Sequence, residues 1–141
     1  MITLAGPTAV GKTSLSVSLA QKYGCEVFSA DSRQLFKEIS IGTAKPNATE
    51  LASVKHHFIN EMSITDPYSA GQYERDFDEK ITAYFENHNV GILTGGTGMY
   101  IKAAIEGLDH FPQIDQSTKD HYINLYKSKG LAGLQTELKL R

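Results

Sequence analysis

Residues 6–13 read Gly6-Pro7-Thr8-Ala9-Val10-Gly11-Lys12-Thr13, which fits the pattern G-x-x-x-x-G-K-[ST] at every fixed position. The pattern is typical of a loop between a strand and a helix, and its flanks agree. Residues 2–5 form a short apolar run, and residues 12–23 carry Leu15, Leu19 and Ala20 on one helical stripe before Gly24. The stretch therefore predicts the first strand, loop and helix of an α/β sheet.

Such a loop binds phosphate for physical reasons. Glycine lets the backbone curl until its N–H groups converge on an anion, and the following helix adds partial positive charge at its N-terminus. Lys12 supplies a full charge, and the Thr13 hydroxyl is placed to ligate Mg²⁺. We expect a diphosphate or a nucleotide such as ATP to bind Gly6, Thr8, Ala9, Val10, Gly11, Lys12 and Thr13. The loop does not say which reaction follows.

Strand and helix signals alternate through the rest of the first part of the chain. We predict further strands over residues 26–30, 57–59 and 90–93. Capping boxes at Asn47–Glu50 and Ser69–Gln72 open two helices, the second running to Asn87, and another helix covers Met99–Glu106. A stripe of apolar residues marks the core face of the second of these helices: Tyr73, Phe77, Ile81, Tyr84 and Phe85. The fold class expected is a P-loop NTPase-like parallel sheet with helices on both faces.

The pattern changes at Pro112. Residues 117–129, closed by Gly130, predict an amphipathic helix, and residues 131–140 begin another. We therefore expect two domains: residues 1–111 as the N-terminal part of a P-loop catalytic core, and 112–141 as the start of a helical insertion domain. Four strands make a thin sheet and the sequence stops within a helical pattern, so it looks truncated.

Composition limits the possible environments and partners. The 141 residues include 14 Lys and Arg against 16 Asp and Glu, a net charge of −2, so there is no basic excess for nucleic acid. The single cysteine, Cys25, suits a reducing compartment, and no signal peptide or membrane-length apolar run is present. A cytoplasmic protein is expected, with no membrane partner and in monomeric form.

The five histidines lack metal-ligand spacing, and the adjacent His56 and His57 point to opposite faces of a strand.

Asp31-Ser32-Arg33-Gln34 follows the second strand, at the sheet edge where ligands bind in parallel sheets. Three interpretations are open for Asp31: it caps the next helix in a solvated turn, it ligates Mg²⁺, or it accepts a proton from a substrate. No other predicted strand ends in aspartate, so the metal and base interpretations compete for this residue.

Two other segments carry weaker signals. Residues 41–46, which include Lys45, are best interpreted as a surface loop. The glycine-rich turn at residues 94–100 serves either close packing of helix on sheet or a ligand contact.

Taken in order, these motifs resemble the tRNA dimethylallyltransferase family, also called tRNA isopentenyltransferase. The resemblance covers residues 3 to about 110 and is carried by residues 6–13, 31–34, 41–46, 66–70 and 95–100. It implies transfer of a dimethylallyl group from dimethylallyl diphosphate to the exocyclic amine of an adenosine, on the 3′ side of the anticodon in a tRNA anticodon loop.

The resemblance also implies roles for single residues. The family's catalytic base falls on Asp31, and its diphosphate site falls on residues 8–13 with Mg²⁺. Its tRNA contacts fall on Asp31, Ser32, Arg33, Gln34, Thr97 and Lys119. Residues 112–141 resemble the start of its inserted tRNA-binding domain. The family's further arginine and its Gln-Arg-rich motif do not occur in this sequence, so we expect the fragment to lack much of the tRNA grip.

Two other function classes stay open from the residues alone. The first is a small-molecule or nucleotide kinase using ATP, with Asp31 on Mg²⁺; the lack of an arginine-rich lid counts against it, because Arg33, Arg75 and Arg141 are the only arginines. The second is a nucleotide-dependent switch, for which no phosphate-sensing loop stands out.

Overall fold

The structure is a computed structural model that describes residues 1–109 and 114–140. The chain forms two compact units, Met1–Leu108 and Asp109–Arg141, and each is described by itself. The domain boundary predicted between residues 111 and 112 lies outside the described residues, and the division into a catalytic core and an insertion domain stays a prediction.

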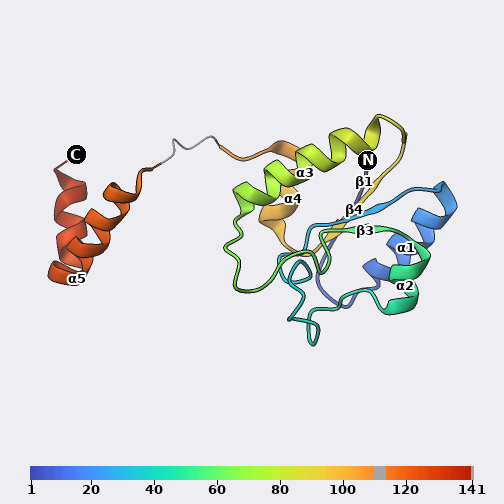
Figure 1. The fold of residues 1–141 in the computed structure, drawn as a ribbon, viewed down its shortest axis with the longest axis horizontal. Helices are drawn as coiled ribbons and strands as arrows, with labels where there is room; N and C mark the ends of the chain where they lie inside the picture. Colours follow the sequence, from blue (N-terminus) through green and yellow to red (C-terminus); the bar gives the residue numbers. More distant parts are fainter. Residues whose placement is uncertain (110–113, 141) are drawn as a thin grey trace. The chain divides into compact units, whose positions relative to one another are not determined.

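The first unit is built on four parallel strands in the order β1-β4-β2-β3 (Figure 1). The strands are β1 Ile2–Ala5, β2 Val27–Ser29, β3 His56–His57 and β4 Ile92–Gly95. Leu93 of β4 lies beside Thr3 of β1 and also beside Phe28 of β2. Because β4 separates β1 from β2, the turn after β4 lies between the loops that follow β1 and β2.

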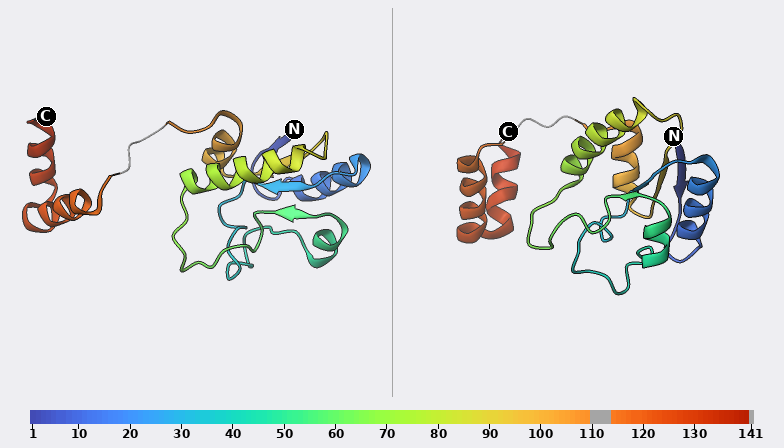
Figure 2. Two further views of the ribbon diagram at one scale, coloured as in Figure 1. Left: turned by 45° about the horizontal axis from the view of Figure 1, so that its top comes forward. Right: turned by 45° about the vertical axis from the view of Figure 1, so that its right-hand side comes forward.

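Helices cover both faces of this sheet, which confirms the predicted fold class (Figure 2). On one face α1, Lys12–Tyr23, and α2, Ala48–Ser53, enclose a small apolar cluster around Val27. On the other face α3, Ala70–Phe85, and α4, Gly98–Glu106, enclose a larger cluster around Phe28. Neighbouring residues of β2 thus enter different clusters, as the alternation of side chains along a strand requires.

Three strand boundaries differ from the prediction, as does the buried stripe of α1. The third strand ends at His57 because Phe58 and Asn60 have φ of 62° and 56°, and left-handed residues cannot continue a strand. The second is shorter than predicted, Val27–Ser29, and the fourth is shifted by two residues, to Ile92–Gly95. In α1 the buried residues are Ser16, Val17 and Ala20, which leaves Leu15 at the margin of the stripe and 50% exposed.

The two predicted capping boxes have different outcomes. Asn47 Oδ1 accepts from the Glu50 N–H at 2.9 Å and Glu50 Oε2 accepts from the Asn47 N–H at 2.8 Å, so the first box is complete. Ser69 Oγ accepts from the Gln72 N–H, but the Gln72 side chain bonds Asp76 instead of closing the box. The second prediction was therefore right for the cap and wrong for the reciprocal bond.

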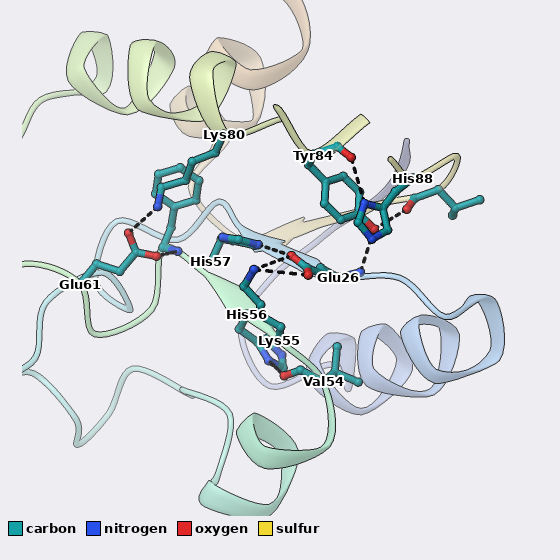
Figure 3. A network of polar contacts seen from close by, with 11 residues as sticks. Glu26, Val54, Lys55, His56, His57, Glu61, Lys80, Tyr84 and His88 are labelled. Carbon is teal, nitrogen blue, oxygen red and sulfur yellow. Dashed lines mark hydrogen bonds and ion pairs between the residues drawn. The ribbon is translucent and has the colours of Figure 1, made fainter. Parts of the chain in front are cut away.

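A network of hydrogen bonds and ion pairs connects the strands and α3 at the amino-terminal end of the sheet (Figure 3). Glu26 Oε2 lies 2.5 Å from His57 Nε2 and 3.2 Å from Lys55 Nζ. The Tyr84 hydroxyl accepts from the Glu26 N–H and donates to Val90 O at 2.7 Å. Partial burial raises the pKa of Glu26, but the hydrogen bonds from His57 and Lys55 outweigh it and hold this pKa below its usual range. The network joins β2, β3, α3 and the start of β4 at the end away from the loop at residues 6–13.

The second unit is a helical pair. The element α5, Gln116–Lys139, is interrupted at Gly130, where φ 61° and ψ −161° are not helical, so two helices meet there as predicted. Asp115 Oδ1 caps the first of them by accepting from the Thr118 N–H at 2.7 Å. None of its described residues is buried, so the predicted amphipathic face is not covered within this unit. In the part of the chain described, no helix has the length and apolar character that a membrane crossing needs.

Gly95 is where β4 approaches β2 most closely. A Cβ atom at this position would lie 2.2 Å from Ala30 O and 2.4 Å from Ala30 C, so the two strands would have to separate. We expect Gly95→Ala to lower the free energy of unfolding by about 1–3 kcal/mol in urea denaturation. Gly98→Ala is the control, because a Cβ there meets nothing within 4 Å. If Gly95→Ala and Gly98→Ala had the same urea midpoint of unfolding, β4 would not approach β2 as closely as described.

Candidate active site

The loop at residues 6–13 has the backbone of an anion cradle. Ala9 and Gly11 both have positive φ, 67° and 91°, and such alternation turns successive N–H groups toward one point. Gly11 is the N-cap of α1, and no described side chain caps that helix, so its first N–H groups are left for a ligand. This local geometry would suit an anion.

A cavity of about 240 Å³ opens beside this cradle. Its walls include Thr8, Ala9, Gly11, Lys12 and Thr13 from the loop and the start of α1. Gly6 and Val10, which the sequence also predicted as phosphate-binding residues, are not among the lining residues. The opposite wall contains Asp31, Gln34, Ala44, Pro46, Glu50, His56 and Ile59.

Lys12 lies over the loop. Its Nζ donates to Pro7 O at 2.5 Å, which holds the ammonium group against the cradle. An ammonium has three donors, so two are left for phosphate oxygens.

Asp31 follows β2 after one residue, Ala30, whose backbone is bonded to β4 and to the turn after β4. The Ala30 N–H donates to Thr94 O at 2.7 Å, and Ala30 O accepts from the Thr97 N–H at 3.1 Å. Asp31 Oδ1 accepts from the Arg33 N–H at 3.0 Å, which closes a turn. The capping interpretation was wrong in one respect, because no helix follows before α2; Asp31 stabilises a turn instead.

The second carboxylate oxygen of Asp31 and the hydroxyl of Thr8 in the loop lie near one common point. A point beside Gly96, where a Cβ would stand, lies 3.8 Å from Asp31 Oδ2 and 4.0 Å from Thr8 Oγ1. Asp31 and Thr8 line the same cavity, because the turn after β4 lies between the loops of β1 and β2.

Ser32, Gln34 and Thr97 are tied into the fold. Thr97 Oγ1 accepts from the Ser32 N–H at 3.0 Å and donates to Ser32 Oγ at 3.2 Å. Gln34 accepts from Ser29 Oγ and donates to the carbonyl oxygens of residues 43 and 44. These side chains fix the turn that carries Asp31. Arg33 is exposed, and Lys119 is exposed in the second unit.

Lys45 makes more hydrogen bonds to the fold than its prediction as part of a surface loop suggests. Its Nζ donates to Phe36 O at 2.5 Å and to Asn60 Oδ1 at 2.7 Å, while Ile41 at the tip of the loop is 96% exposed. Burial lowers the pKa of Lys45 from its ordinary value. The loop is therefore anchored by Lys45 beside the cavity wall.

His56 is a cavity residue that the sequence analysis missed. Its Nδ1 pairs with Val54 O at 2.8 Å, and its Nε2 is buried without a partner among the described residues. His57 instead stacks on Phe28 with ring centroids 4.4 Å apart, so the two rings do face opposite sides of the sheet. Because the two histidines are adjacent in a strand, the sequence predicted that their rings point to opposite faces of the sheet. It did not show that the face of His56 lines the cavity.

The pKa of His56 gives a pH prediction. Burial lowers this pKa, so on acidification the unfolded chain takes up a proton before the folded one does. Stability should therefore fall as the pH drops below about 6.5, the ordinary pKa of histidine. We expect the melting temperature of His56→Gln to fall less between pH 7 and pH 5 than that of the unsubstituted protein. The exposed His121→Gln is the control, and parallel curves for all three proteins would contradict the assignment.

No group of three or more His, Cys, Asp or Glu side chains among residues 1–109 and 114–140 is arranged to hold a metal ion. The cavity lining also contains no arginine from the described residues. Lys12 is the one lysine among the described residues that line the cavity.

Known proteins of one kind resemble this chain. The family model for IPP transferase matches residues 34–141. Proteins named tRNA dimethylallyltransferase from Flavobacterium johnsoniae and Christiangramia forsetii are 48% and 46% identical over 99% and 98% of this chain. The matches cover 45% and 46% of those proteins, so the chain spans about half the length of these curated relatives.

Solved structures that resemble this chain are also named as transferases of this kind. The full-length tRNA isopentenylpyrophosphate transferase from Bacillus halodurans matches 97% of this chain with a TM-score of 0.74 and 33% identity, and the match covers 46% of that protein. A eukaryotic dimethylallyltransferase acting on tRNA matches 96% of the chain with a TM-score of 0.74 and 26% identity, over 37% of its own length.

Proposed function

The chain belongs to the IPP transferase family, and from this premise we propose that the complete gene product transfers a dimethylallyl group to tRNA. The donor is dimethylallyl diphosphate, and the acceptor is the exocyclic amine of an adenosine beside the anticodon. One observation carries the proposal: Asp31 Oδ2 and Thr8 Oγ1 lie within 4.0 Å of the same point, so a carboxylate faces a phosphate cradle across a single gap.

The leaving group is stabilised on the cradle side. The C–O bond of the allylic donor breaks with its electron pair remaining on the diphosphate. Fixed donors aimed at that developing charge lower the barrier, and the loop amides with Lys12 Nζ are such donors. The residues present also suit Mg²⁺, which prefers one or two protein oxygens together with phosphate oxygens and water; the Thr13 hydroxyl would hold it. Bound there, Mg²⁺ would neutralise charge on the diphosphate.

The acceptor is activated on the carboxylate side. The lone pair of the adenine amine is delocalised into the ring, so the amine is a weak nucleophile until its proton is accepted. Asp31 Oδ2 takes that proton while the nitrogen forms its bond to the donor carbon. Asp31 Oδ1 stays on the Arg33 N–H and keeps the carboxylate aimed. The adenosine must leave the anticodon-loop stack to enter the gap.

We assign the tRNA contacts to Asp31, Ser32, Arg33, Gln34, Thr97 and Lys119, by resemblance to the family. Arg33 and Lys119 are exposed cations that suit phosphate contacts, while Ser32, Gln34 and Thr97 hold the turn in place. A helical tRNA-binding insertion beginning at residue 112, a monomeric state and a cytoplasmic location belong to the same proposal. We also infer that ATP can bind the cradle, but only as a competitor of dimethylallyl diphosphate and not as a substrate. The reason is that the relatives are named as prenyl transferases and not as kinases.

The test is transfer of a labelled prenyl group. The complete gene product is incubated with Mg²⁺, unfractionated tRNA and dimethylallyl diphosphate labelled in its carbon chain. We expect label in tRNA and, after digestion, one adenosine heavier by a dimethylallyl group. Phosphate transfer from γ-labelled ATP with no modified adenosine would instead support the kinase alternative and overturn the proposal.

A further inference from the structure

Three glycines follow one another closely at the turn after β4, and their surroundings differ. A Cβ at Gly95 would collide with the backbone of Ala30 at 2.2 Å, so the fold requires glycine there. A Cβ at Gly98 would meet nothing within 4 Å. A Cβ at Gly96 would touch three groups at ordinary contact distance: Gly6 O at 3.6 Å, Asp31 Oδ2 at 3.8 Å and Thr8 Oγ1 at 4.0 Å.

The fold does not explain the glycine at position 96. Its φ is not in the left-handed region, which would favour glycine on conformational grounds. No contact of the added Cβ would be shorter than 3.6 Å, so packing does not forbid a methyl group. Gly96 is also exposed, and its neighbour Gly95 lines the cavity. Because Gly96 has no side chain, the space beside Asp31 Oδ2 and Thr8 Oγ1 stays free.

We propose that Gly96 sets the clearance in which the donor carbon and the acceptor amine meet, which makes it a specificity-determining residue of this site. The inference rests on the proposed function. The amine must reach Asp31 Oδ2 to give up its proton, and the carbon must stay attached to a diphosphate held beside Thr8 until its C–O bond breaks. The reacting pair therefore occupies the volume that a methyl group at position 96 would fill.

A methyl group there would hinder the meeting of the donor carbon and the acceptor amine, and not the binding of the diphosphate. The diphosphate is held by the N–H groups of the loop and by Lys12, and the loop atoms that the added Cβ would approach most closely, Gly6 O and Thr8 Oγ1, are not among these donors. Adenine, by contrast, is a rigid plane that cannot bend around a new methyl group. We therefore expect binding of the donor to survive and the approach of the amine to the carbon to fail.

The experiment compares Gly96→Ala with Gly98→Ala in the complete gene product. For each protein we measure the melting temperature, the Kd for dimethylallyl diphosphate by calorimetry, and the single-turnover rate of transfer to tRNA at saturating donor. Gly96→Ala should melt like the unsubstituted protein, keep its donor Kd within about twofold, and transfer about a hundredfold more slowly, the cost of a misplacement near 1 Å. Gly98→Ala should match the unsubstituted protein in all three.

Three results would overturn the inference. A folded Gly96→Ala that transfers at the normal rate shows that the clearance is not used. A Gly96→Ala that unfolds shows that the fold itself needs the glycine. A slow variant whose donor Kd rises in proportion shows a role in donor binding. If the unsubstituted protein transfers no prenyl group, the proposed function fails first and the result is distinct from these.

Discussion

Asp31→Asn is expected to lower the single-turnover rate of prenyl transfer by about a thousandfold, within the range that a positioned general base contributes. The amide has the shape of the carboxylate and its oxygen still accepts from the Arg33 N–H, which now lies 3.0 Å from Oδ1. It cannot take a proton from the amine. The loss should therefore appear in the rate at saturating substrates, measured by rapid quench with labelled donor, while the donor Kd stays unchanged.

Asp66→Asn is the matched control for this variant. Asp66 Oδ2 also accepts a backbone N–H in a turn, that of Ser63 at 3.2 Å, but it does not line the cavity. It should transfer normally. If Asp31→Asn lost donor binding together with Mg²⁺ binding, Asp31 would be a metal ligand and the assignment as base would be wrong.

Lys12→Met should weaken the donor complex and slow the reaction together. One charged donor to a phosphate contributes about 1.5–3 kcal/mol, so the Kd for dimethylallyl diphosphate should rise about tenfold to a hundredfold. Because the negative charge on the leaving group grows as the C–O bond breaks, the loss in kcat/KM should be larger, about a thousandfold. Calorimetry and steady-state kinetics on the complete gene product separate the two effects.

Lys22→Met provides the comparison, because Lys22 lies in the last turn of the same helix, 5.6 Å from the Tyr23 ring and away from the cavity lining. It removes the same charge and should change neither quantity by more than about twofold, since long-range effects of exposed charges are screened. An unchanged donor affinity in Lys12→Met would remove the loop at residues 6–13 from the mechanism.

Local chemistry explains what the sequence predicted well. The motif at residues 6–13 and the apolar stripe of α3 are consecutive or periodic, so they predicted the backbone of the cradle, the core face of α3 and the helices on both sides of the sheet. The prediction was wrong for Phe85, the last residue of the stripe, which is 36% exposed. Asp31 was placed correctly at the sheet edge because strand ends in a parallel sheet share one edge.

Tertiary contacts explain what the sequence could not show. The role of Gly96 depends on strand order, since only the insertion of β4 between β1 and β2 brings it between Asp31 and Thr8. The place of His56 in the cavity depends on the register of β3 on β2, in which His56 lies beside Val27. The different neighbours of Gly95 and Gly96 cannot be distinguished by any sequence pattern, because both are glycines in one turn.

The most direct measurement of the central claim is a crystal structure of the complete gene product with the unreactive thiolo analogue of dimethylallyl diphosphate. Our proposal requires the diphosphate on the backbone amides of residues 8–13, with the first carbon of the dimethylallyl group beside Gly96 and facing Asp31 Oδ2. A diphosphate bound away from this loop, or a carbon chain pointing away from Asp31, would contradict it.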